Sequence, residues 1–86
     1  MTIQWHSFID ITSEICPMTF VKTKLAIERI EAGEILKIRL KGSEPLDNVP
    51  ASLIDHGHQI ISQKPENSKQ TSATDVHILY VVKAPD

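Results

Sequence analysis

Residues 17–41 have the sequence PMTFVKTKLAIERIEAGEILKIRLK, in which the spacing of the apolar residues changes midway. In the first half, residues suited to one buried face follow Phe20 at three, seven and ten positions, which is the spacing of an α-helix. In residues 34–41, apolar residues alternate with mainly charged ones, as in a strand with one buried face. We therefore predict a helix over residues 17–32 and a strand over residues 34–41, with a helix C-cap at Gly33 between them. The face that these elements bury is predicted to contain Phe20, Thr23, Ala26, Ile27, Ile30, Leu36, Ile38 and Leu40.

Outside this stretch, apolar alternation predicts three more strands, over residues 6–11, 58–63 and 76–83. A second, short helix is expected between a turn at residues 42–45 and Gly57, with Asn48 as its N-cap and Pro50 in its first turn. Residues 64–74, KPENSKQTSAT, contain no large apolar residue and are predicted to form a long hairpin loop. The order β-α-β-α-β-β predicts an α+β fold, a two-layer α/β sandwich with both helices on one face of a four-stranded mixed sheet.

Composition and charge limit the kinds of function. With 86 residues, of which 41% are hydrophobic and 23% charged, the chain is predicted to form one soluble domain over residues 1–86. Its net charge of −2 gives no general attraction for nucleic acid or anionic lipid, and no apolar run is long enough to span a bilayer. No signal peptide is evident, and a single cysteine excludes an internal disulfide, so we expect a cytoplasmic protein.

The only cysteine, Cys16, immediately precedes the predicted first helix. At that position its sulfur is expected to lie near the unpaired N–H groups of the first turn and the positive end of the helix dipole. Both favour the thiolate, so we expect the pKa of Cys16 to lie below that of a free cysteine. A thiolate there can attack a sulfane sulfur, and the same N–H groups, in a turn stiffened by Pro17, can hold the persulfide anion that results. The position of Cys16 by itself is equally consistent with an inert cysteine that fills a gap in the core.

Several landmarks at fixed spacing resemble the TusA/SirA family of small sulfur carriers. Asp10 is followed six residues later by Cys16 and then Pro17, where the family has a Cys-Pro-x-Pro motif that opens a helix. A Gly-Glu pair, here Gly33 and Glu34, stands where the second strand of the family begins. The remaining landmarks are Asn48-Val49-Pro50 and Gly57-His58, so that the resemblance covers about residues 8–83.

This resemblance implies a sulfur carrier, a relay protein of the sulfurtransferase type, that accepts sulfane sulfur as a persulfide on Cys16 and passes it to a partner protein. The implied partners are a sulfur-donor protein of the desulfurase or rhodanese type and a sulfur-acceptor protein, without nucleic acid or membrane. They are expected to dock on the helix start and the adjoining loops. We expect no metal and no other cofactor. The residues expected to support the cysteine are Glu14, Pro17, Thr19 and Lys24.

Three positions differ from the family. Thr19 replaces the second proline of the motif, and its hydroxyl is expected to interact with the first helical turn. Ser13 replaces a glycine that often precedes the cysteine by three residues. Lys41 and Gly42 replace an acidic pair of the members that thiolate transfer RNA. Because this changes the sign of the charge near the cysteine, the partners need not be those of the transfer-RNA pathway.

The four histidines, His6, His56, His58 and His77, are weaker candidates. A metal site needs three or four converging ligands, so we interpret these histidines mainly as solvated or capping residues. His6 and His58, on predicted strands, are the ones most able to reach Cys16 as a catalytic base, although neither is close to it in sequence.

Nearby charged and aromatic residues each allow two interpretations. Lys22 and Lys24 either raise the positive potential around the thiolate or form an ordinary solvated helix face, and the family also has a basic residue at the position of Lys24. Glu14 either orients the loop before the cysteine or is simply an exposed charge. Trp5 and Phe8 either pack near the first strand or belong to a docking surface.

One further class of function remains open, a non-catalytic regulatory or protein-interaction module of the same fold. In such a module Cys16 would be structural or would sense redox state. A thiol-dependent reductase or transferase subunit is disfavoured, because the chain has no second cysteine to resolve a disulfide.

Overall fold

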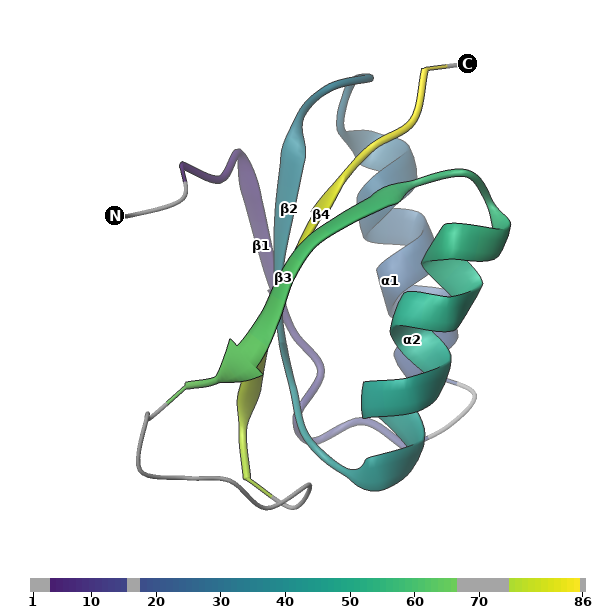
Figure 1. The fold of residues 1–86 in the computed structure, drawn as a ribbon. Helices are drawn as coiled ribbons and strands as arrows, with labels where there is room; N and C mark the ends of the chain where they lie inside the picture. The colour runs from purple at the N-terminus through teal and green to yellow at the C-terminus, as the bar shows by residue number, and fades with distance from the viewer. Residues whose placement is uncertain (1–3, 16–17, 67–74, 86) are drawn as a thin grey trace.

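The structure, a computed structural model, describes residues 4–15, 18–66 and 75–85. In chain order its elements are β1 (Ser7–Asp10), α1 (Met18–Arg29), β2 (Ile35–Leu40), α2 (Ser43–Asp55), β3 (Gln59–Pro65) and β4 (His77–Val82). Both helices lie on one face of a four-stranded sheet, and in the part of the chain that the structure describes no helix covers the other face, which is called the open face here (Figure 1). This arrangement confirms the predicted two-layer α+β fold. Within the described ranges, neither helix is long and apolar enough to cross a membrane.

The strand order β1-β2-β4-β3 places β2 between its neighbours in the interior of the sheet. β1 pairs with β2 in parallel, whereas β2 with β4 and β4 with β3 pair in an antiparallel manner, so the sheet is mixed as predicted. Because parallel strands need a connection that returns along the sheet, α1 serves as the crossover between β1 and β2. The start of α1 therefore lies at the end of the sheet where β1 finishes (Figure 1).

The hydrophobic core lies between the sheet and the two helices. Leu36, Ile38 and Leu40 on β2 are completely buried, which confirms the predicted alternation. Burial of each such side chain stabilises the fold by roughly 1.5–3 kcal/mol. The other buried aliphatic residues of the core are Ile11, Ala26, Ile27, Ile30, Val49, Leu53, Leu79 and Val81.

The buried face of α1 is rotated slightly from the predicted one. Thr19 is buried, whereas Phe20 is only half-buried and lies at the side of α1 that faces α2. Thr23 is buried as predicted, and its hydroxyl donates a hydrogen bond of 2.7 Å to the carbonyl of Thr19. This bond compensates the burial of a polar side chain against the sheet.

α1 ends at Arg29, earlier than the predicted residue 32. Lys83, just beyond β4, donates its Nζ hydrogen bonds to the carbonyls of Ile30 at 2.6 Å and Glu28 at 3.3 Å. A cation there satisfies carbonyl groups left over at the end of the helix and complements the negative end of its dipole. Gly33 follows with a φ of +87°, a conformation that favours glycine, and its N–H donates to the carbonyl of Lys83 at 2.9 Å.

The predicted start of the second helix is wrong. α2 begins at Ser43, so residues 43–45 form its first turn and Asn48 lies within the helix instead of capping it. Pro45 is tolerated there because the N–H groups of a first helical turn have no helical partner. Pro50, expected in the first turn, consequently lies in the helix interior.

The proline inside α2 has a compensating partner on the sheet. Pro50 has no N–H to donate to the carbonyl of Leu46, four residues earlier. The side-chain amide of Gln63, on β3, donates to that carbonyl instead at 3.1 Å. A side chain from another element thus satisfies an acceptor that the helix cannot satisfy itself.

The third strand is longer than predicted. β3 ends at Pro65, so Lys64 and Pro65 belong to a strand and not to the predicted loop. The N–H of Glu66 donates to the carbonyl of Val76 at 2.8 Å and continues the pairing of β3 with the chain that leads into β4. The rest of the predicted loop, residues 67–74, lies outside the described residues.

We predict that Gln63→Ala lowers the free energy of unfolding by about 0.5–1.5 kcal/mol, because it removes the donor to the carbonyl of Leu46. In a Pro50→Ala background the N–H of residue 50 can restore the helical bond, so the same change is expected to cost less. Urea unfolding of the four proteins in this double-mutant cycle measures the difference. Strictly additive effects would contradict the compensation.

Candidate functional site

The cysteine loop, defined here as residues 11–17, connects β1 to α1. Cys16 and Pro17 lie outside the described residues, whereas the first five residues of the loop are described. Ile11 anchors the loop, since its side chain is buried in the core and its N–H donates to the carbonyl of Arg39 at 2.9 Å. The N–H of Glu14 donates back to the carbonyl of Ile11 at 3.1 Å, which turns the chain toward α1.

The carboxylate of Asp10 shapes the entry to the cysteine loop. One of its oxygens accepts hydrogen bonds from the hydroxyl of Thr12 at 2.7 Å and from the N–H of Thr12 at 2.9 Å. The other oxygen accepts from Nη1 of Arg39 at 3.0 Å. The bonds from Thr12, first the hydroxyl and then the N–H, lower the pKa of Asp10, and the Arg39 guanidinium adds to this effect. An ionised carboxylate therefore holds the local turn.

Sequence reasoning used Asp10 only as a landmark of the resemblance and missed this role. The available signal was the Asp-x-Thr spacing of residues 10–12, because an Asp side chain commonly bonds the backbone two residues later. The contribution of Arg39, from β2, carries no such local signal, since it depends on the pairing of Asp10 with Arg39 in the sheet.

Glu14 forms an ion pair with Lys22 on α1, so it is not a free exposed charge. The pair joins the cysteine loop to the second turn of the helix, which favours the interpretation that Glu14 orients the loop. The negative charge of Glu14 also offsets the positive charge of Lys22. Lys22 therefore contributes less positive potential around the loop. A surface pair of this kind contributes little to global stability, so its effect is local.

The residues on either side of Cys16 and Pro17 are exposed. Ile15 is 81% exposed and Met18 is 42% exposed. The N–H of Met18, the first residue of α1, donates to the carbonyl of Ile15 at 2.8 Å. Thr19, expected to support the cysteine, is buried on the core side of the helix.

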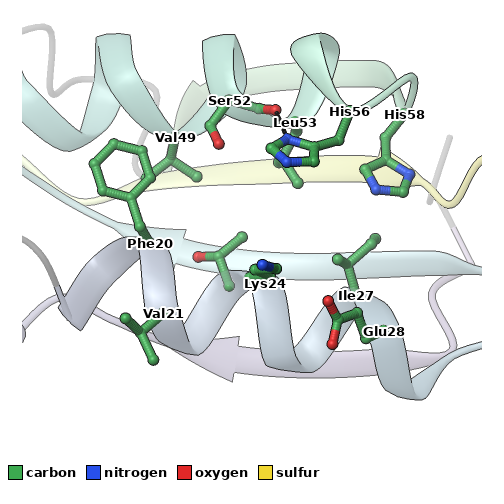
Figure 2. Close-up of a pocket in the computed structure, with 11 residues that line it drawn as sticks. Phe20, Val21, Lys24, Ile27, Glu28, Val49, Ser52, Leu53, His56 and His58 are labelled. Carbon is green, nitrogen blue, oxygen red and sulfur yellow. Dashed lines mark hydrogen bonds between the residues drawn. The ribbon is translucent and has the colours of Figure 1, made fainter.

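Lys24 lies along a groove of about 170 Å³ between α1 and α2 (Figure 2). Phe20 and Val49 lie at one end of this groove, and His56 and His58 lie at the other (Figure 2). Lys24 is six residues after the start of α1, a rise of about 9 Å along the helix axis. The lysine is therefore separated from the first turn and borders a largely apolar surface.

His6 and His58, the histidines considered as partners of the cysteine, bond to backbone groups. Nδ1 of His6 accepts from the N–H of Ile35 at 3.0 Å, and Nδ1 of His58 accepts from the N–H of Ala84 at 2.9 Å. Burial, assisted by nearby His56 and Lys83, lowers the pKa of His58, which favours the neutral acceptor form.

Both histidines lie at the end of the sheet where α1 ends, as the register of Ile35 with Val82 and the bond from Gly33 to Lys83 show. The 12 residues of α1 span about 18 Å, which separates this end from Met18. This placement disfavours a pairing with the cysteine loop. His56 and His77 likewise bond to carbonyl groups, those of Ser52 and Asp75, each at 2.8 Å.

Trp5 and Phe8 pack together on the open face of the sheet, with ring centroids 6.0 Å apart. Nζ of Lys37 lies 5.4 Å from the centroid of Trp5 and 5.6 Å from that of Phe8, within the range of cation–π attraction. On the same face Arg39 pairs with Glu66, and this hydrogen bond is the main cause of the lowered pKa of Glu66. Lys37 and Arg39 therefore make this face partly polar, beside the two aromatic rings.

A sequence model of the family described as sulfurtransferase TusA matches residues 7–76, which include the cysteine loop and both helices. The chain belongs to the TusA family. A relative in Archaeoglobus fulgidus, named "Putative sulfur carrier protein", is 34% identical over 70 residues, which are 81% of this chain and 80% of the relative. A relative of the same name in Thermotoga maritima is 28% identical over 53 residues, or 62% of this chain and 67% of the relative.

A solved structure supports the fold of this TusA-family chain. The crystal structure of a SirA-like protein from Desulfitobacterium hafniense superposes on this chain with a TM-score of 0.67. The superposition covers 92% of this chain and 99% of the chain of that protein. Its sequence is 19% identical, so this likeness concerns the fold alone. The match to the family model and the relative in Archaeoglobus fulgidus confirm the family membership predicted from the spacing of sequence landmarks.

We predict that Thr12→Val raises the pKa of Asp10 toward its ordinary value, because the hydroxyl of Thr12 is the main cause of the lowering. Thr12→Ser, which keeps a hydroxyl, is the matched control and is expected to leave the pKa close to that of the wild type. Carbon-detected NMR titration of the Asp10 carboxyl group measures both.

The expected dependence on pH has a definite sign. Because the folded-state pKa of Asp10 is lowered, its contribution to stability is present above the unfolded pKa and is lost as the pH falls through the folded value. Thr12→Val should reduce this loss in acid. An unchanged Asp10 pKa in Thr12→Val would contradict the proposed anchoring of the loop.

Proposed function

We propose that this TusA-family protein is a sulfur carrier, a relay protein of the sulfurtransferase type, that holds sulfane sulfur as a persulfide on Cys16. The observation that carries the proposal is the position of the only cysteine in the chain, two residues before α1 and inside the segment that matches the family. The names of the relatives support the same role. The exposure of Ile15 and Met18 supports access of a partner protein to this segment.

In the proposed loading step, the thiolate of Cys16 attacks the outer sulfur of a persulfide on a donor protein. A new S–S bond forms on Cys16, the S–S bond of the donor breaks, and the donor keeps the electron pair as its own thiolate. In the unloading step a thiolate of an acceptor protein attacks the outer sulfur on Cys16 in the same way. Each step exchanges one S–S bond for another, so neither an external oxidant nor a metal is needed.

The start of α1 supports this chemistry through its electrostatics. The N–H groups of a first helical turn and the positive end of the helix dipole stabilise an anion near them, which favours both a thiolate and a persulfide anion. In the proposal, Pro17 stiffens the turn and Glu14, tied to Lys22, holds the preceding loop. Lys24 adds positive potential from the second turn, while the buried Thr19 packs the helix start onto the core.

The proposed partners are a sulfur-donor protein of the desulfurase or rhodanese type and a sulfur-acceptor protein. The proposed compartment is the cytoplasm, where reducing conditions keep a lone cysteine as a thiol. No direct role of nucleic acid or of a membrane enters the proposal.

We predict that incubation with inorganic polysulfide adds the mass of one sulfur atom to the protein, located at Cys16 by peptide mass spectrometry. The Cys16→Ser variant should gain nothing, because the hydroxyl is not ionised at neutral pH and cannot form the S–S bond. Its thermal unfolding should stay close to that of the wild type, since the change is nearly isosteric.

The pH dependence of alkylation of Cys16 by iodoacetamide provides a second measurement. The proposal expects an apparent pKa below the value of about 8.5 for a free cysteine. An ordinary pKa together with no sulfur gain would refute the carrier function and favour an interaction module in which Cys16 is structural or redox-sensing.

A further inference from the structure

The groove between α1 and α2 has apolar walls over most of its length (Figure 2). Phe20, Val21 and Ile27 line it from α1, and Val49 and Leu53 line it from α2. Ile27, Val49 and Leu53 also belong to the hydrophobic core, so the fold itself fixes the base of the groove. The volume of about 170 Å³ gives room for roughly six groups the size of a water molecule or a methylene. The groove therefore has space for a short apolar chain.

At the end of the groove formed by His56 and His58, one ring presents a donor whose tautomer is set by its surroundings (Figure 2). Nδ1 of His58 accepts from the N–H of Ala84 at 2.9 Å, so the neutral ring carries its hydrogen on Nε2. Within the described ranges, no protein group accepts a hydrogen bond from Nε2 of His58. The groove thus ends at an N–H group that a ligand can use.

The charges around this end of the groove favour an anion. Lys24 lines the groove, and among the described residues it forms no ion pair. The positive charges of His56 and Lys83 act on the ring of His58, whereas the carboxylate of Glu28, which also lines the groove, does not shift the pKa of that ring. The last carbonyl groups of α2 accept from the N–H groups of residues 56–58, which limits their negative potential. An anionic group is therefore complementary to this end.

We propose that the groove binds a small amphiphilic acid, whose apolar chain lies between the helices and whose carboxylate lies beside His58 and Lys24. The N–H at Nε2 of His58 and the ammonium group of Lys24 supply donors for the two carboxylate oxygens. Glu28 carries a like charge and disfavours a doubly charged head group such as a phosphate. An apolar cleft with a few polar groups that orient the ligand is typical of small-molecule sites.

The size of the groove favours a free small molecule over a protein. A stable protein complex buries roughly 800 Å² of surface on each partner, whereas this groove has room for only about six carbon atoms. The histidine end also lies at the end of the sheet where α1 finishes, away from the cysteine loop. The inference therefore does not rest on the proposed sulfur chemistry.

The first experiment compares head groups on the wild-type protein. Hexanoate, hexan-1-ol and hexylamine are titrated while nitrogen–proton NMR spectra are recorded. We expect saturable binding of hexanoate with a dissociation constant of about 1 mM, at least about fivefold tighter than either other compound, because the carboxylate gains charge-assisted hydrogen bonds. The ring Nε2 of His58 should shift on binding, while the ring of His77, which does not line the groove, should not.

The second experiment measures the length of the apolar site with butanoate, hexanoate, octanoate and decanoate. Each methylene that enters the groove is expected to raise the affinity about two- to fourfold. The gain should level off once about six carbon atoms fill the volume. An affinity that keeps rising by the same factor up to decanoate would contradict a site of this size.

Two pairs of variants test the walls and the charge. Ser52 lines the groove from α2, so Ser52→Leu should fill it and lower the affinity for hexanoate about tenfold or more, while Ser52→Ala leaves it open and should bind like the wild type. Lys24→Met keeps an aliphatic stem without the charge and should lower the affinity about fivefold. Lys64→Met, on β3 and outside the groove, is its matched control. Circular dichroism melting curves verify the fold of each variant.

The outcomes that would overturn the site are distinct from those that concern the cysteine. Equal or tighter binding of hexylamine, undiminished binding in Ser52→Leu or Lys24→Met, an equal loss in Ser52→Ala, or no saturable binding of hexanoate would each overturn it. Cys16→Ser should bind hexanoate like the wild type. Sulfur loading therefore tests the proposed function alone, and hexanoate binding tests this inference alone.

Discussion

Burial of one face of β2 is the interaction on which the rest of the structure depends. Leu36, Ile38 and Leu40 are completely buried beneath the two helices, and β2 is hydrogen-bonded on both sides. Because α1 crosses over between parallel strands, the same burial fixes the end of the sheet at which α1 begins. The core therefore decides at which end of the sheet residues 11–15 lie.

Side chains from distant elements complete what the helices cannot satisfy alone. Lys83 bonds to carbonyl groups at the end of α1, and Gln63 bonds to the carbonyl that Pro50 leaves without a donor in α2. Arg39, from β2, likewise donates to the Asp10 carboxylate at the entry to the cysteine loop. In a domain of 86 residues the core is small, so such long-range hydrogen bonds have an importance that they would lack in a larger protein.

α1 divides stability and function between its two sides. Its inner side packs Thr19, Thr23 and Ile27 against the sheet, and its outer side presents apolar and basic residues to solvent. A helix anchored in this way can offer a rigid surface at little cost in conformational entropy on binding. This division is consistent with the proposed exchange of sulfur with partner proteins, which would take place at the surface of the domain.

The sequence by itself determined the order of the elements, the face that β2 buries, and the family, because these depend on period, spacing and residue type. It also identified Cys16 as the candidate carrier, since the chain has no other cysteine. The start of α2 was not predicted, because Pro50 is tolerated inside the helix only with the hydrogen bond that Gln63 donates from β3. The pairing of Arg39 with Asp10 and the distance of His6 and His58 from the start of α1 likewise arise only when strands far apart in the sequence pair. Local spacing carries no record of such contacts, so the tertiary structure alone decided them.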